Sequence, residues 1–528
     1  MADMETPDKR WARTMAELGQ TPVSRQGYLP DLEPLISSGS LTRTLLPRSF
    51  SSPACSPMLM ATRPTSPPVD GHVQTAGVCV MAAVPSPPRT GRNNGRLWGT
   101  TFSLCSATLG AGALSLPYAF SHVGALGGVS LLFLTASASY YSIVLLSSAI
   151  ARSGARSYEE LTVRLFGKAV GVLVELNIVA VCYGSAIAYT VALGDLLHPL
   201  AAAWLSRRAT MALGWVVLML PLSMYGRISE LRWASVFGVA SVIYLVLTVL
   251  AHSGACAVQI GDAATATRGL SYWSFSLKSF ESLAIMMFAF TCQVNVPALY
   301  AELEERSLRR MKVVASRAMG IAFTCYLLVG LAGYRDAPRS APNLLGNYCV
   351  RKPSSLNASR LLLPAYVAIG LAVCVAYPFN VHPCRYTLDV MLCEQLGAPP
   401  LRTSNAAGLI RHVAWTVGIT GSALLIALYV PGINVVFQLM GSTCSAFVCF
   451  VLPGAFGLAL RLPEASGKSG IAACVALIVG GASIGVVATA ITCADLMTQH
   501  AEGAHQHHAS LADSGVCERA DECAAAPY

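Results

Sequence analysis

Long apolar runs alternate with short polar segments over most of this chain. From Trp98 onwards, each run has about twenty mainly apolar residues, enough to cross the ~30 Å hydrocarbon core of a bilayer as a helix. The pattern predicts eleven spans, at residues 98–121, 125–151, 169–197, 209–225, 232–253, 280–303, 313–334, 361–384, 410–430, 433–460 and 470–496. Such repetition excludes a soluble enzyme and predicts an all-α integral membrane protein with eleven transmembrane helices.

The two ends of the chain do not show this pattern. Residues 1–95 are rich in Ser, Pro, Thr and Arg, a composition that predicts a disordered tail rather than a packed core. Within this tail, residues 31–36 (DLEPLI) resemble an acidic dileucine sorting signal, which is a receptor-read address and not an anchor. Residues 497–528 are again polar. We therefore expect one transmembrane domain, at 96–496, between two solvated tails.

Two of the predicted spans are interrupted near their middle. The first contains Gly110 and Gly112, which weaken a helix, followed by Pro117, which removes a backbone donor. The sixth span carries polar Gln293 and Asn295 just before a proline. Polar side chains and freed backbone groups are costly at membrane depth unless protein, water or a ligand satisfies them. Both interruptions therefore predict broken helices with a possible binding role.

The interrupted spans are five apart, which is the spacing expected from two halves of five helices in inverted orientation, followed by one extra helix. In such folds the binding site lies near the bilayer midplane between the broken helices. Half-helix N-termini then present N–H groups to an anion such as a carboxylate. The alternative is that both interruptions are incidental kinks at Gly and Pro.

Composition and charge support a membrane protein and suggest its orientation. The chain is 54% hydrophobic and 12% charged, whereas soluble proteins are roughly 25% charged. The net charge of +9 comes from scattered basic residues, which set topology and do not form a nucleic-acid-binding patch. With the N-terminus in the cytosol, 26 of the 36 basic residues lie inside and 10 outside, so this orientation is predicted, with a non-cytosolic C-terminal tail. The 17 cysteines include no CxxC pair, and we expect no metal and no cofactor.

Short motifs along the spans occur in an order that is typical of a known family. They lie at residues 110–120 (GAGALSLPYAF), 157–161, 166–167, 220–223, 288–290, 300–303, 383–385, 430–433 and 441–443. No single motif is specific, but the ordered set over residues 96–496 resembles the amino acid/auxin permease family. The resemblance implies secondary active transport of amino acids by alternating access, on a leucine-transporter-like fold.

The resemblance also implies where the substrate binds. Its site maps here to Thr108, Leu109, Gly110, Ala111, Gly112, Phe288, Ala289, Phe290, Thr291 and Cys292. Tyr189 in the third span is a further candidate, because such folds often place a hydroxyl near the substrate carboxylate; the alternative is an aromatic packing residue. The expected partners are therefore an amino acid, a coupling ion and the lipid bilayer.

Three polar residues are candidates for ion coupling. Glu175 is the deepest carboxylic acid that the sequence places in a span, and its alternative role is a structural hydrogen bond. Gln293 and Asn295 are polar groups beside the second interruption, although Gln293 replaces a His found in many family members and cannot titrate. Residues 361–376 of the eighth span contain no Ser or Thr, which disfavours sodium and favours a proton or uncoupled exchange.

Other interpretations are left open by the sequence. An amino acid sensor that signals through the N-terminal tail has the same fold signature, and so does a sodium-coupled symporter. An enzyme is not expected, because we find no nucleophile with its base and no metal motif. The membrane is expected to be the plasma membrane or a vacuolar or lysosomal one. Glu281 and Glu302, at the two ends of the sixth span, are expected to be interfacial.

Overall fold

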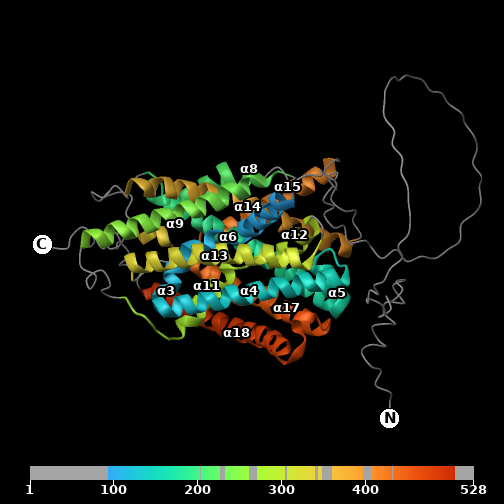
Figure 1. Cartoon of the computed structure of the whole chain (residues 1–528). Helices are drawn as coiled ribbons and strands as arrows, with labels where there is room; N and C mark the ends of the chain where they lie inside the picture. Colours follow the sequence, from blue (N-terminus) through green and yellow to red (C-terminus); the bar gives the residue numbers. More distant parts are fainter. Residues whose placement is uncertain are drawn as a thin grey trace, which may run out of the picture. The chain divides into compact units, whose positions relative to one another are not determined.

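The computed structural model describes residues 93–201, 204–225, 232–260, 270–303, 306–338, 340, 343–347, 359–396, 406–430 and 432–505. All regular structure within these ranges is helical (Figure 1). Nine helices among the described residues are long and apolar enough to cross a membrane. The predicted sorting signal and almost all of the N-terminal tail lie outside the described residues.

Most of the predicted spans are continuous helices. They are α4 (Ala125–Ser153), α6 (Lys168–Ala201), α9 (Arg232–Ile260), α13 (Leu308–Asp336), α14 (Ser359–Leu396), α15 (Ala406–Ala427) and α18 (Gly467–His505). The helix α18 continues past the predicted span end at residue 496, since the polar residues that follow contain no proline before His505.

The other spans are built from several short elements. The first comprises α2 (Asn93–Thr108), the 3-10 helix η1 (Ala111–Ser115) and α3 (Leu116–Val123), and the fourth comprises α7 (Arg207–Gly214), the π-helix η2 (Trp215–Met219) and α8 (Leu220–Ser223). The sixth comprises α11 (Lys278–Ala289), the 3-10 helix η4 (Gln293–Asn295) and α12 (Val296–Glu302), and the tenth comprises α16 (Ile433–Met440), the π-helix η6 (Gly441–Val451) and α17 (Leu452–Ala459). The first and fourth are not among the nine long helices.

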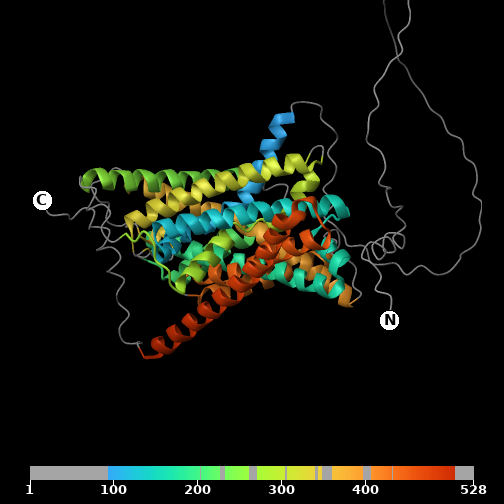
Figure 2. The ribbon, with the colours of Figure 1, turned by 60° about the horizontal axis from the view of Figure 1, so that its bottom comes forward.

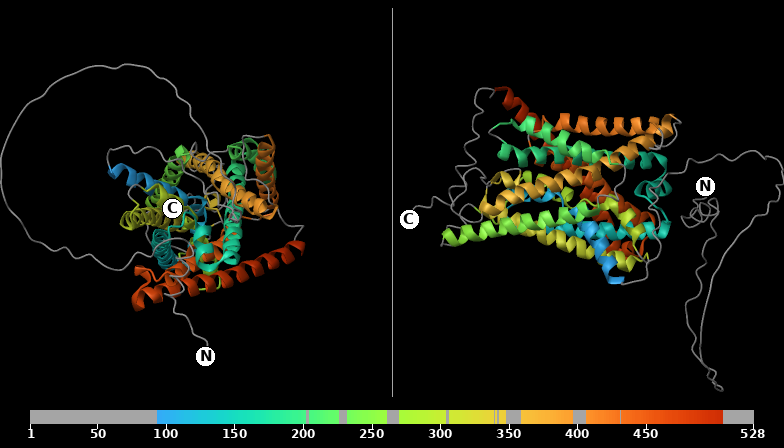
Figure 3. Two further views of the ribbon diagram at one scale, coloured as in Figure 1. Left: turned by 90° about the vertical axis from the view of Figure 1, so that its right-hand side faces the viewer. Right: turned by 90° about the horizontal axis from the view of Figure 1, so that it is seen from above.

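The interrupted sixth span lies inside the bundle, and α18 lies at its margin. In their most apolar windows, 67% of the residues of Lys278–Glu302 are buried, compared with 22% in Gly467–Thr498. Figures 2 and 3 show α18 in red, running obliquely along one side of the other helices. α11 packs against α3, η6, α16 and α18, so elements from both halves of the chain surround it. The interruptions are therefore placed where protein, and not lipid, surrounds them.

The short helix α5 (Tyr158–Phe166) connects a polar loop to the core. It begins because the Ser157 side chain accepts a hydrogen bond from the backbone N–H of Glu160, and it ends at Gly167, whose φ of 88° suits glycine. Tyr158 is buried and donates a hydrogen bond of 2.6 Å to the carbonyl of Val448 in η6. The loop is thereby tied to the π-helix that packs on α11.

A second connection joins α13 to the turn between α17 and α18. Lys312 Nζ lies 2.9 Å from Glu464 Oε1, and the Tyr141 hydroxyl of α4 donates to the Glu464 carbonyl at 3.1 Å. Burial by itself raises the pKa of Glu464, but the hydrogen bond and charge of Lys312 lower it below the ordinary value of 4.5. The carboxylate form of Glu464 thus stabilises the folded protein.

The Lys312–Glu464 pair predicts a pH dependence of stability. Because the pKa of Glu464 is lower in the folded chain, its contribution is complete above about pH 4.5 and is lost as pH falls through the folded pKa. We expect Lys312→Met to lower the free energy of unfolding by about 0.5–1 kcal/mol at neutral pH, a modest amount because the lysine is half exposed. We also expect the variant to lose less Tm than the wild type when the pH falls below 4.5. Thermal unfolding of purified protein between pH 7 and 3.5 measures both effects. Lys468→Met, at an exposed lysine, is the control, and identical curves for the two variants contradict the prediction.

Candidate functional site

The two interruptions meet at one place in the bundle. α2 ends at Thr108, and the backbone of Gly110 is extended, with φ −132° and ψ −152°, before η1 begins. α11 ends at Ala289, three residues before η4. A Cβ atom added to Gly112 would lie 2.9 Å from the Cβ of Ala289 and 3.0 Å from its Cα. Only glycine therefore allows the first break to approach the end of α11 this closely.

The end of α11 has a complete set of hydrogen bonds. Helix termini leave four carbonyl groups without partners in the helix. In α11, three of them accept hydrogen bonds from the residues of the break, namely the N–H of Phe290 and the N–H and hydroxyl of Thr291. The fourth, the carbonyl of Ala289, accepts a hydrogen bond of 3.0 Å from the hydroxyl of Tyr326. This end of the broken helix is thus satisfied by protein groups.

Tyr326 joins the two breaks, and the sequence did not identify it. It belongs to α13 and is fully buried, and its single O–H is shared between the carbonyl of Ala289 and that of Thr108, the last residue of α2, which lies at 2.6 Å. Its ring packs edge to face on Phe290, with 5.3 Å between centroids. A tyrosine within an apolar span gives no signal of which backbone its hydroxyl contacts, so only the three-dimensional structure reveals this role.

Tyr189 of α6 lies beside the first break. A Cβ atom on Gly110 would be 3.3 Å from its hydroxyl oxygen, and the hydroxyl is also within hydrogen-bonding reach of the Asn380 side chain on α14. The residue is half-buried. The structure therefore places this sequence-predicted hydroxyl at the position where the backbone of the first span is extended.

The remaining predicted site residues gather around the same two breaks. Thr108, Leu109, Ala111, Gly112, Ala289, Phe290 and Cys292 are buried, whereas Gly110, Tyr189, Phe288 and Thr291 are half-buried. The ring of Phe288 stacks on Phe437 of α16 at 4.7 Å, and the hydroxyl of Thr291 lies 2.7 Å from that of Ser445 in η6. None of these eleven residues carries a charged side chain, so the breaks offer backbone dipoles, hydroxyls and aromatic rings to a ligand.

The three coupling candidates occupy different environments. The side-chain oxygen of Gln293 accepts from the N–H of Cys292 at 2.9 Å, and its nitrogen is buried with no hydrogen-bond partner among the described residues. Asn295 is exposed. Glu175 is half-buried on α6, about 21 Å along the helix from Tyr189, so the structure does not bring it to the breaks.

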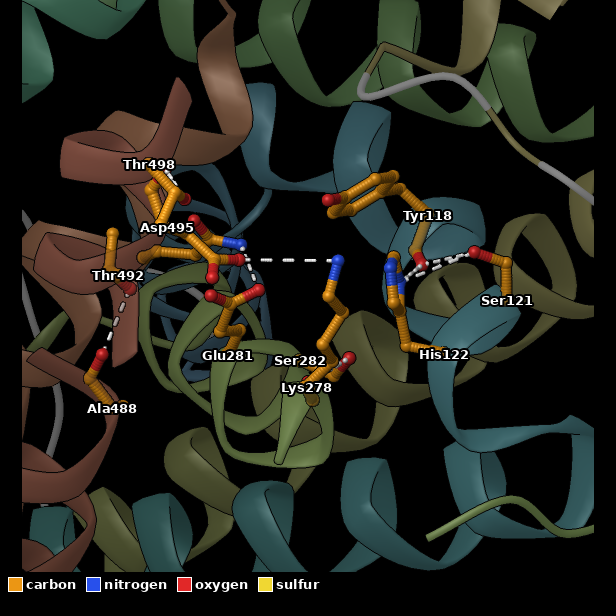
Figure 4. A network of polar contacts seen from close by, with 11 residues as sticks. Tyr118, Ser121, His122, Lys278, Glu281, Ser282, Ala488, Thr492, Asp495 and Thr498 are labelled. Atoms are coloured by element: carbon orange, nitrogen blue, oxygen red, sulfur yellow. Dashed lines mark hydrogen bonds and ion pairs between the residues drawn. The ribbon is translucent and has the colours of Figure 1, made fainter. Parts of the chain in front are cut away.

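A polar network lies between α3, α11, α16 and α18 (Figure 4). Glu281 is only 4% exposed and accepts a hydrogen bond of 3.1 Å from Gln438, so it is buried among the helices, while its expected interfacial depth in the membrane stays a prediction. Lys278 lies 4.0 Å from Asp495 of α18. Together with Tyr118 these side chains line a cavity of about 50 Å³, a size suited to water. Helices that extend over the start of α11 bury a carboxyl group that the sequence placed at the edge of a span.

Comparison with known families decides which class of membrane protein carries this site. The family model described as transmembrane amino acid transporter protein matches residues 93–498. The chain belongs to this family. The resemblance to amino acid/auxin permeases, drawn from the motifs, is thus confirmed. The match includes both breaks, Tyr326 and all nine long helices of the described residues.

Individual relatives in the transmembrane amino acid transporter family are distant. Vacuolar amino acid transporter 6 of Saccharomyces cerevisiae is 25% identical over 409 residues, which are 68% of this chain and 88% of the relative. Vacuolar amino acid transporter 5 of Schizosaccharomyces pombe is 27% identical and covers 67% of this chain and 82% of its own length. Human solute carrier family 38 member 10 is 25% identical over 67% of this chain and 32% of its own.

Among solved structures, that of MhsT in complex with L-phenylalanine is similar over 74% of this chain and 97% of its own, with a TM-score of 0.46 and 13% sequence identity.

Proposed function

We propose that this member of the transmembrane amino acid transporter family moves amino acids by secondary active transport with alternating access, and that the substrate binds between the two breaks. The observation that carries the proposal is the meeting of the breaks. Gly112 touches Ala289, and Tyr326 hydrogen-bonds the ends of both α2 and α11. A ligand bound there contacts two helices at once, so its presence or absence favours different arrangements of them.

The chemistry of the breaks matches a zwitterion. The N–H groups at the start of η1 and the hydroxyl of Tyr189 suit the α-carboxylate, because helix N-termini attract anions. Hydroxyl and carbonyl groups around Thr291 suit the α-ammonium group. The absence of charged side chains among the eleven predicted site residues favours substrates with uncharged side chains, with Phe288 as part of the apolar wall.

The proposal includes a topology. The count of eleven spans comes from the nine long helices of the described residues together with the two interrupted segments at 98–121 and 209–225. We assign spans one to five and six to ten to two inverted halves, with the N-terminus in the cytosol as the basic residues favour. Two of the relatives are vacuolar amino acid transporters, which supports a vacuole-type membrane over the plasma membrane.

We further propose that a proton drives transport, with Glu175 as the first candidate for carrying it. In proteoliposomes loaded with buffer, uptake of a radiolabelled mixture of neutral amino acids is expected to rise at least fivefold when a proton gradient is imposed, and to be unchanged when choline replaces sodium. Glu175→Gln is expected to abolish the response to pH while keeping amino acid exchange, because Gln preserves hydrogen bonding but does not titrate.

Glu281→Gln is the comparison, since it changes another carboxyl of the predicted spans, one that is more deeply buried. Loss of the proton response only in the Glu281 variant moves the coupling role to that residue and removes Glu175 from it. Strict dependence on sodium refutes proton coupling. Substrate binding without any uptake in all conditions refutes transport and favours the sensor.

A further inference from the structure

Two half-helices end at the same hydroxyl group. Thr108 is the last residue of α2 and Ala289 the last of α11, and both carbonyl oxygens share the single O–H donor of Tyr326, at 2.6 and 3.0 Å. The C-terminal end of a helix carries a partial negative charge. Two such ends brought together repel one another unless a positive group lies between them.

In transporters built from broken helices, the carbonyls of half-helix C-termini and unwound segments commonly coordinate a sodium ion or a proton. Here the group between the two C-termini is the O–H of a neutral side chain. We infer that the Tyr326 hydroxyl takes the place of a cation at this junction, so that the two breaks are held together without sodium. The inference rests on the proposed binding of substrate between the breaks and names the residue that positions them.

The packing of the ring and of its helix fixes the hydroxyl at this point. The ring is fully buried against Phe290, and α13, which carries it, packs on both α2 and α3. A Cβ added to Gly112 would lie 3.7 Å from the phenol oxygen, so the hydroxyl also borders the first break.

The four carbonyls at the end of α11 are all engaged by protein donors. Three of them accept from Phe290 and Thr291, and the Tyr326 hydroxyl completes the set. A sodium ion needs several oxygen ligands, and each carbonyl already engaged with a donor has one lone-pair direction fewer to offer. The lack of Ser and Thr at residues 361–376 is an independent observation in the same direction.

The first test needs no substitution. Thermal unfolding of the purified full-length protein is measured in sodium chloride, potassium chloride and choline chloride at equal ionic strength. We expect Tm values that agree within about 1 °C, because no folded-state sodium site adds binding free energy. A rise in Tm specific to sodium, increasing with its concentration, overturns the inference.

The second test compares two tyrosines of α13. Tyr326→Phe removes the hydroxyl at the junction, whereas the control Tyr334→Phe removes a buried hydroxyl that accepts from the backbone N–H of Ser271 at 2.9 Å, away from the breaks. In sodium-free uptake we expect KM to rise at least tenfold in the first variant, with a smaller change in the maximal rate, and to stay within twofold in the control. Equal effects of the two substitutions overturn the positioning role.

The results of these two tests can be told apart from a failure of the proposed function. If none of the proteins takes up amino acids, the proposed function fails, while the ion dependence of the wild-type Tm still tests whether the folded protein binds sodium. If Tyr326→Phe does not fold, the same wild-type comparison decides the inference by itself.

Discussion

Gly112→Val is expected to lower amino acid uptake at least 100-fold while the protein remains inserted and monodisperse. Even a single Cβ at this position would lie 2.9 Å from the Cβ of Ala289 and 3.0 Å from its Cα. A backbone atom at the end of α11 cannot turn aside as a side chain does, so valine must push the two breaks apart. Uptake into proteoliposomes, normalised to protein that elutes as a single species, measures the effect.

Two other glycines make this experiment specific. A Cβ on Gly110 would meet only the hydroxyl of Tyr189 at 3.3 Å, and a side chain can adjust, so Gly110→Ala is expected to be milder than Gly112→Ala. Gly320 of α13 has open space around its Cβ position, and Gly320→Ala is expected to leave uptake unchanged. Wild-type uptake by Gly112→Val contradicts a substrate site at these breaks.

The largest expected effect on folding belongs to Gly441→Ala. A Cβ at Gly441, the first residue of η6, would lie 1.9 Å from the carbonyl oxygen of Ala284 in α11. Overpacking by a methyl group ordinarily costs ~1–3 kcal/mol, and here the obstacle is backbone within a buried helix, which leaves no low-energy adjustment. We expect little or no monodisperse protein from this variant at any growth temperature.

The control for this packing is Gly418→Ala in α15, where nothing lies within 4 Å of the added atom. Its yield and Tm are expected to equal or slightly exceed those of the wild type, because Ala favours helix over Gly. Normal yield and unchanged Tm for Gly441→Ala would show that η6 does not pack on α11 as closely as described.

The breaks were predictable because their causes are local. Gly110 and Gly112 weaken a helix wherever they occur, and the polar Gln293 interrupts an apolar run, so the chain signals both positions within a few residues. Tyr326 could not be found this way. Its role depends on α13 lying against the first break, a contact between residues more than 200 positions apart in the chain.

The burial of Glu281 was not predictable from its local sequence. Its place near the end of a span suggested an interfacial position and gave no sign that α16 and α18 pack over it and bury it. The π-helix at Gly441–Val451 was also not predicted, since its composition of small and apolar residues is equally typical of an α-helix. Burial and helix type at these places are set by neighbouring elements and not by the local sequence.

The length of α18 has a consequence for where the transporter works. Its 39 residues extend about 58 Å, nearly twice the ~30 Å of a hydrocarbon core, and it runs obliquely to its neighbours (Figure 2). A thicker bilayer favours a more upright helix and a thinner one a more tilted helix. Since α18 carries Asp495, such a change of tilt moves that carboxylate relative to Lys278. We therefore expect membrane thickness to act on the polar network at the start of α11.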